Sequence, residues 1–304
     1  MSSASALNLV AGDLQAVLWP DQGMLCASLR RSGVELLRRV EDLDAARAKG
    51  STAGIPFLYP WANRLAALHY NVAGRDVFLN PSSPFLHFDE HALPMHGVPW
   101  PKLRWEVIGA SQERVSARLP WSSKELLEVF PFPHEVEMDV QIHPGELTFE
   151  ITVSAGSESV VPISFGFHPY FGIPGVPRSE WKLRLPPMLR LTLNAQGIPT
   201  GEVKPFSATD APLGSQSYDD GFALKEDHAV FGITAAGHAI RIEFVEGFHF
   251  AQVFAPARKE LIAVEPMTAP TNALMSGESL TLLRPGKTYR ASFSISVEKM
   301  DEKR

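Results

Sequence analysis

The 304-residue sequence predicts an all-β protein built as a large antiparallel β-sandwich. Short runs that alternate apolar and polar residues recur along the chain, and Gly, Pro, Asn or Asp residues bound them. The 25 prolines and 22 glycines are spread throughout, so no region stands out as a linker. The best helical stretch, residues 40–49, is short. Repeated short strands with turn residues between them are typical of sandwiches and barrels. We expect one domain over residues 1–304, ending in a solvated tail at about 298–304.

The individual strands follow from this alternation. Cys26 lies in an alternating run near the N-terminus and is expected to be a buried strand residue and not a nucleophile. A turn at HPGE (143–146) should join two strands into a hairpin, and a second hairpin is expected across Ala-Ala-Gly at 235–237. The clearest strand segments are 136–142, 147–153, 240–244 and 289–297.

Composition and charge exclude several classes of function. The net charge of −6, with no basic stripe, argues against a nucleic-acid partner. The longest stretch without Asp, Glu, Lys or Arg, residues 159–177, is interrupted by proline and glycine and is not expected to span a membrane. The first residues have neither the basic nor the apolar region of a secretory signal. We expect a cytoplasmic monomer or homodimer.

The residue with the strongest chemical signal is Glu265. It ends the apolar run 261–265 and precedes Pro266, which favours an extended conformation. Alternation along a strand places Leu261, Ala263 and Glu265 on one face. Apolar neighbours should raise the pKa of this carboxyl towards the range of a useful general base.

His168 is the matching candidate acid. The same alternation turns Phe165 and Phe167 towards the core and His168 to the opposite face, beside the small residues Ser164 and Gly166. The small neighbours leave room for a ligand. Taken alone, this segment is equally compatible with a core histidine whose hydrogen bonds are satisfied.

Three further segments carry polar groups suited to binding. Arg64 follows Asn63 after a proline-rich apolar run and offers a planar donor fork, although a surface ion pair is the commoner use of a lone arginine. His96 precedes a glycine in a loop, where a structural and a functional role are about equally frequent. Asp219 and Asp220 lie where a turn opens a strand, and at least one of them is expected to form an Asx turn.

One segment matches the sequence pattern of a metal site. HFDEH at 87–91 matches the zinc-protease pattern H-x-x-E-H, in which both histidines must lie on one helix. Prolines crowd this segment and no helical apolar face extends from it. We therefore expect no metal ligands here, and no metal or cofactor in the protein.

Five segments in the same order resemble the aldose 1-epimerase (galactose mutarotase) family: PWANRL (60–65), MHG (95–97), GFHPYF (166–171), YDDGFAL (218–224) and AVEPMT (263–268). The resemblance implies a mutarotase-type sandwich with a sugar in an open cleft across one sheet. It also implies that Glu265 is the base on the anomeric hydroxyl and His168 the acid on the ring oxygen. His96, Arg64, Asn63 and Asp219 would bind the sugar.

Departures from the best-known branch leave the aldose open. A second aspartate follows Asp219 where histidine is frequent in that branch, so the sequence does not decide which aspartate contacts the sugar. The favoured function is interconversion of the anomers of a free aldose. The alternatives are a hexose-6-phosphate 1-epimerase and a non-catalytic carbohydrate-binding sandwich that uses Trp61, Trp100 and Tyr170 as aromatic platforms. A glycosidase would require two carboxylates at the cleavage point, which suits the Glu/His pair less well.

Overall fold

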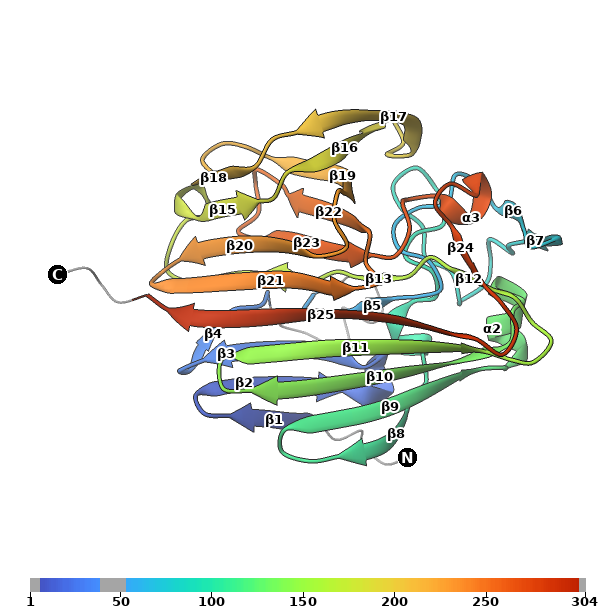
Figure 1. Ribbon diagram of the computed structural model, residues 1–304, viewed down its shortest axis with the longest axis horizontal. Coiled ribbons are helices and arrows are strands. Elements are labelled where there is room, and N and C mark those ends of the chain that lie inside the picture. Colours follow the sequence, from blue (N-terminus) through green and yellow to red (C-terminus); the bar gives the residue numbers. More distant parts are fainter. Residues whose placement is uncertain (1–5, 39–52, 301–304) are drawn as a thin grey trace.

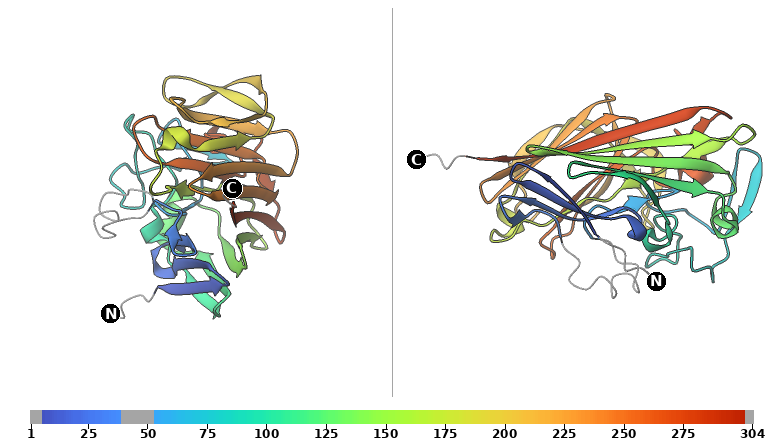
Figure 2. Two further views of the ribbon diagram at one scale, coloured as in Figure 1. Left: turned by 90° about the vertical axis from the view of Figure 1, so that its left-hand side faces the viewer. Right: turned by 90° about the horizontal axis from the view of Figure 1, so that it is seen from below.

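Two large antiparallel sheets form the body of the molecule (Figures 1 and 2). The computed structural model describes residues 6–38 and 53–300. The larger sheet has nine strands, in the spatial order β18 (Thr209–Pro212), β15 (Lys182–Leu185), β20 (Ala229–Ala235), β21 (His238–Glu246), β25 (Thr288–Lys299), β11 (Glu146–Ala155), β10 (His134–His143), β9 (Arg114–Trp121) and β8 (Glu106–Ala110).

The second sheet has eight strands, and two of them carry the candidate residues Asp219 and Glu265. Its spatial order is β17 (Pro199–Phe206), β16 (Met188–Leu193), β19 (Tyr218–Leu224), β22 (Phe250–Ala255), β23 (Ile262–Met267), β13 (Gly166–Phe167) and β5 (Phe57–Leu58), with β14 (Tyr170–Phe171) also paired to β23. The prediction of an all-β antiparallel sandwich is confirmed.

Smaller elements complete the described part of the chain. A four-stranded sheet and two strand pairs flank the large sheets, and the two α-helices within residues 6–38 and 53–300 are short. These elements are β1 (Leu7–Ala11), β2 (Leu14–Trp19), β3 (Leu25–Arg31) and β4 (Val34–Glu35); β6 (His69–Val72) with β7 (Arg75–Phe78); β12 (Val161–Ile163) with β24 (Thr281–Leu283); α2 (Lys124–Val129) and α3 (Ala273–Ser276); and the 3₁₀ turns Pro20–Gln22, Trp100–Lys102 and Arg178–Glu180. No helix in the described ranges is long and apolar enough to cross a membrane.

Local patterns predict the hairpins correctly. β10 and β11 pair from His134 opposite Ala155 to His143 opposite Glu146, around a Pro-Gly turn. β20 and β21 pair around Ala236 and Gly237, both of which have positive φ, as the two-residue turn requires. The predicted tail begins too early, because β25 continues to Lys299 opposite His238. The helix expected at 40–49 lies outside the described residues.

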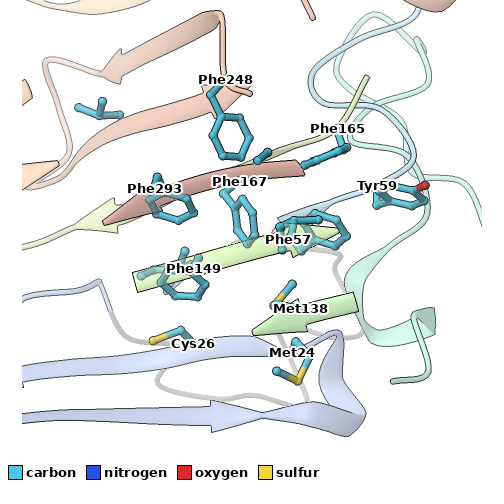
Figure 3. Close-up of a cluster of buried hydrophobic side chains, with 14 of the residues drawn as sticks. Met24, Cys26, Phe57, Tyr59, Met138, Phe149, Phe165, Phe167, Phe248 and Phe293 are labelled. Carbon is cyan, nitrogen blue, oxygen red and sulfur yellow. The ribbon is translucent and has the colours of Figure 1, made fainter. Parts of the chain in front are cut away.

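Aromatic rings fill the space between the two large sheets (Figure 3). Phe149 of β11 stacks on Phe293 of β25 with ring centroids 4.8 Å apart. Phe167 of β13 contacts these two rings from the other sheet, at 5.5 and 4.9 Å. Phe165 is fully buried in the same cluster, as is Cys26 on β3, which is the buried strand residue predicted. The predicted core-facing side of segment 163–168 is therefore confirmed.

β23 separates this core from a second environment. Ile262 and Val264 belong to the main core, whereas Leu261 and Ala263 pack with Tyr170 in a small separate cluster. This is the alternation expected from the sequence. It turns Glu265 away from the main core and towards the opposite face of the eight-stranded sheet.

Candidate active site

A cleft of about 560 Å³ lies on the face of the eight-stranded sheet that is turned away from the main core. Its floor includes side chains of β19, β22 and β23, and loops around residues 63–64 and 87–96 contribute the walls. All six residues predicted to act or bind line this one cleft: Asn63, Arg64, His96, His168, Asp219 and Glu265. Segments that are far apart in the sequence thus meet at one site.

Two ionisable groups of the cleft, Glu265 and His168, are almost completely buried. Glu265 is 2% exposed and His168 is 5% exposed. His168 Nε2 lies 3.2 Å from Glu265 Oε1. Glu265 Oε2 and His168 Nδ1 are also buried and have no hydrogen-bond partner among the described residues. The carboxyl group therefore contacts the imidazole through one oxygen, and its other oxygen has no partner in the part of the chain that the structure describes.

Tyr170 supports the imidazole of His168 from one side. The two rings stack with centroids 3.9 Å apart and planes 10° apart. The Tyr170 hydroxyl is also 2.9 Å from His168 Nε2. Proline at 169 and alternation on either side of it bring residues 168 and 170 to the same face. Of the three aromatic platforms suggested by the sequence, only Tyr170 lines the cleft, whereas Trp61 and Trp100 are buried elsewhere.

Burial shifts the pKa values of the pair in opposite directions. Loss of solvent raises the pKa of the Glu265 carboxyl well above its ordinary value; nearby Asp219 adds to the rise and Arg64 opposes it. Burial lowers the pKa of the His168 imidazole well below its ordinary value, and nearby His96 lowers it further. Both shifts disfavour charge in a dry site. The shifts therefore favour a protonated Glu265 carboxyl beside a neutral His168 imidazole, a state in which the two partners hold one exchangeable proton.

Asn63 and His96 belong to two loops in which both residues have left-handed backbone conformations, with φ of 57° and 59°. The Asn63 backbone N–H donates to His96 Nδ1 at 3.2 Å, and the His96 backbone N–H donates to the Asn63 carbonyl at 2.8 Å. Because Nδ1 accepts, the neutral imidazole carries its proton on Nε2. Burial lowers the pKa of His96 to about 3, with smaller contributions from His87 and Arg64. His96 is therefore a fixed neutral hydrogen-bond donor.

Arg64 is held as a wall of the cleft by three oxygen atoms. Its Nε donates to Asp89 Oδ2 at 2.5 Å, and Nη1 donates to Asn63 Oδ1 at 3.1 Å. Nη2 lies 3.7 Å from Glu90 Oε1. The Arg64 side chain is only 11% exposed and that of Asp89 only 2%. The surface ion pair that is common for a lone arginine does not describe this buried, oriented guanidinium.

Asp219 and Asp220 have different surroundings. Both lie within β19, and neither forms the expected Asx turn, because their side chains engage other strands. Asp219 Oδ1 accepts from Gln252 Nε2 at 2.8 Å, and Asp219 lines the cleft. Asp220 instead faces Arg190, whose Nε is 3.5 Å from its Oδ1. Of the two aspartates, Asp219 is the one that lines the cleft together with Glu265 and His168.

Gln252 is a site residue that the sequence reasoning missed. It is 4% exposed, lies in the apolar strand β22 and stands opposite Glu265 in the strand pairing. Through its bond to Asp219, Gln252 links that carboxylate to β22, the strand that pairs with the strand of Glu265. The sequence feature that could have identified Gln252 is its position as a lone amide in the apolar run FAQVFA.

The HFDEH segment forms no helix in the structure. His87 lines the cleft beside His96, and burial lowers its pKa, against an opposing effect of Asp89. His91 lies in a neighbouring pocket instead. The two histidines of the zinc-protease pattern therefore line different pockets.

Comparison with known proteins identifies a family for the chain. The family described as "Aldose 1-epimerase" matches residues 9–296. The uncharacterized protein YihR of Escherichia coli strain K12 is 25% identical over 96% of this chain and 93% of its own length.

Solved structures share the fold. A putative aldose 1-epimerase from Escherichia coli K12 superposes with a TM-score of 0.78 at 21% identity, covering 97% of this chain and 99% of its own. A galactose mutarotase-like protein from Clostridium acetobutylicum superposes with a TM-score of 0.82 at 18% identity, covering 96% of this chain and 95% of its own. The Slr1438 protein from Synechocystis superposes with a TM-score of 0.80 at 24% identity, covering 98% of this chain and 97% of its own. The family match spans nearly the whole sequence, and the chain belongs to the aldose 1-epimerase family.

Proposed function

We propose that this protein is an aldose 1-epimerase, an isomerase that interconverts the α and β anomers of a free aldose. The observation that supports this most strongly is the contact of His168 Nε2 with Glu265 Oε1 at 3.2 Å, at the buried end of a polar cleft. A carboxyl group and an imidazole at this spacing can exchange protons with the two oxygen atoms of one hemiacetal. A protein that only binds sugar has no need of a buried carboxyl whose ionisation is disfavoured.

The reaction requires one proton to leave the C1 hydroxyl and another to reach the ring oxygen. Glu265 Oε2 accepts the hydroxyl proton while His168 donates a proton to the ring oxygen. The bond between C1 and the ring oxygen breaks, and C1 becomes an aldehyde. Rotation about the C1–C2 bond then exposes the other face of the carbonyl. Closure reverses both proton transfers, so the enzyme returns to its starting state with no net gain or loss of protons.

The protonation state of the pair follows from its pKa shifts. With one proton between them, one partner is an acid and the other a base. The 3.2 Å contact lets that proton reside on either residue, so the pair can assume the form with ionised Glu265 and protonated His168 that opens the ring. Each positioned proton transfer typically contributes about 10²–10⁴-fold to the rate. This chemistry uses the two side chains alone, and we propose no metal or cofactor for it.

The remaining cleft residues position the sugar in this proposal. His96 offers an Nε2–H donor of fixed tautomer, and Arg64 offers guanidinium donors held by Asp89 and Asn63. Asp219 offers a carboxylate that can accept bonds from sugar hydroxyls. Gln252 fixes the orientation of Asp219. Donors and acceptors on several strands thus surround the space next to the acid–base pair.

Polarimetry of freshly dissolved α-D-glucose and α-D-galactose tests the function. The purified protein should speed the approach to the equilibrium rotation above the spontaneous rate, in proportion to its concentration. A rate equal to that of the buffer with both sugars, and with other common aldoses, would sink the proposal.

A further inference from the structure

A second pocket of about 500 Å³ adjoins the cleft. Arg64, Glu90 and Asp219 line both spaces, whereas His168 and Glu265 line the first but not the second. Arg64 and Asp219 therefore stand at the boundary, with the acid–base pair on one side only. Both volumes fall in the range of small-molecule sites. Together the two spaces form an elongated site with its chemistry at one end.

The second pocket is walled by β16, β17 and the turn between them. This turn approaches the cleft through Gly197, which has φ of 74°. A Cβ atom built on Gly197 would lie 3.0 Å from Arg64 Nη1, so a larger residue would press on the guanidinium. The turn is itself ordered, since Asn194 Oδ1 accepts from the backbone N–H groups of Gln196 and Ile198. The pocket is thus a shaped extension of the cleft.

Charge in the second pocket is balanced. Arg64, Arg190 and Lys204 contribute three formal positive charges, and Glu90, Asp219 and Asp220 contribute three negative ones. Arg190 and Lys204 stand directly opposite each other on β16 and β17. Arg190 is held against Asp220 and over the rings of Phe206 and Phe222, at 5.1 and 5.6 Å. Such a lining does not select an anion, because three carboxylates would repel it.

The other lining groups suit a polyol. Thr192 and Gln196 add a hydroxyl and an amide, and Leu191 and Leu193 add apolar surface. Hydroxyl groups of a sugar both donate and accept hydrogen bonds, and they can use carboxylates, ammonium groups and amides of this kind. The C–H faces of a sugar ring can pack on the leucines.

We propose that this pocket, lined by Arg190, Thr192 and Lys204 among others, binds a second glycosyl unit, so that the preferred substrates are reducing disaccharides. This inference rests on the proposed function. In a reducing disaccharide the free anomeric carbon belongs to one unit, and the second unit is attached at a carbon remote from it. The reducing unit occupies the cleft with C1 at Glu265 and His168. The linked unit passes Arg64 and Asp219 into the second pocket.

The test compares mutarotation of glucose with that of maltose and melibiose, which carry the second unit at two different carbons. At least one disaccharide should show a kcat/KM about tenfold above that of glucose, the effect of one or two net hydrogen bonds. Thr192→Leu and Lys204→Ala should each remove most of this advantage and leave glucose turnover within about twofold. Val203→Ala is the matched control, because Val203 precedes Lys204 on β17 and is exposed outside both pockets.

Calorimetric binding to the Glu265→Gln variant supplies a readout independent of turnover. The preferred disaccharide should bind more tightly than glucose, and Lys204→Ala in that background should abolish the difference. Equal affinities would refute the subsite whether or not the chain is an epimerase. A hexose 6-phosphate that outperforms both disaccharides and depends on Lys204 would also overturn it, by showing an anion site. Failure of the proposed function is distinct, because no sugar would then mutarotate faster than in buffer.

Discussion

Asn63 and His96 hold each other in place through two hydrogen bonds, although they come from different loops. The Asn63 N–H donates to His96 Nδ1 at 3.2 Å, and the His96 N–H donates to the Asn63 carbonyl at 2.8 Å. Both residues have the left-handed backbone conformation. The two loops therefore present a histidine of defined tautomer and an arginine of defined orientation to the same cleft.

The backbone conformation of Asn63 gives the first prediction. Asn63→Val places a β-branched residue at φ 57°, whereas Asn63→Gly keeps that conformation without strain. We expect the valine variant to be less stable than the glycine variant by about 1–2 kcal/mol in urea unfolding. Both variants should show a raised KM, because Arg64 loses its contact with the Asn63 side chain. Equal unfolding free energies would show that the left-handed conformation carries no cost here.

Arg64 should be sensitive to loss of its planar fork. Arg64→Lys keeps the positive charge, but its donors lie on one nitrogen atom instead of three, so it cannot span the positions of Asp89, Asn63 and a ligand. We expect KM to rise about tenfold, with kcat and the unfolding free energy changing less. Arg118→Lys is the matched control, since Arg118 forms an exposed ion pair with Glu106, a type of contact that contributes little. If Arg64→Lys behaved like this control, Arg64 would have no role in binding.

The pH dependence of kcat/KM should follow the shared proton of the pair. Below the lowered pKa of His168 both partners are protonated and no base remains. Above the raised pKa of Glu265 both have lost their protons and no acid remains. We expect an acid limb with its midpoint below 6.5, the ordinary pKa of histidine, and a plateau of activity above that limb. Initial rates corrected for the spontaneous reaction give this profile, and an acid midpoint above 6.5 would contradict the assignment.

Buried neutral histidines should make the fold sensitive to acid. His134, outside the cleft, has its pKa lowered to about 4 by burial, against the opposing effect of its bond to the Phe132 carbonyl, and the pKa of His96 is lowered to about 3. Between those values and about 6.5 the unfolded chain binds more protons than the folded one. The free energy of unfolding must therefore fall as the pH is lowered through this window.

The size of this effect is about 1.4 kcal/mol per pH unit for each histidine. His134→Gln should remove one such contribution between pH 6 and 4.5 and leave neutral-pH activity intact, because His134 does not line the cleft. Urea unfolding of both proteins at several pH values measures the slopes. Parallel curves for wild type and variant would mean that His134 is not kept neutral by the fold.

The sequence predicted those parts of the fold that depend on local pattern. The hairpin of β10 and β11 follows from alternation in both strands and the Pro-Gly turn between them. The position of β25 between β21 and β11 does not follow from any local pattern. These partners are distant in the sequence, and their pairing depends on tertiary contacts. Strand existence was therefore predictable, whereas strand order was not.

The candidate site was likewise predictable only where a local pattern identifies a residue. Glu265 and His168 were identifiable because each is a lone titratable group in an alternating apolar run. Gln252 has the same kind of setting, but an amide does not titrate and drew no chemical expectation. The contact between Asn63 and His96 requires two left-handed residues in separate loops, and no local pattern encodes that meeting.

The most direct test of the central claim is the mutarotation rate of Glu265→Gln beside the wild type and His168→Asn. Glutamine keeps nearly the shape of glutamate but cannot accept the anomeric proton, and asparagine cannot protonate the ring oxygen. We predict that each change lowers the polarimetric rate by about 10²-fold or more, while calorimetry shows sugar binding largely retained in Glu265→Gln. A Glu265→Gln enzyme with near wild-type turnover would show that Glu265 is not the base.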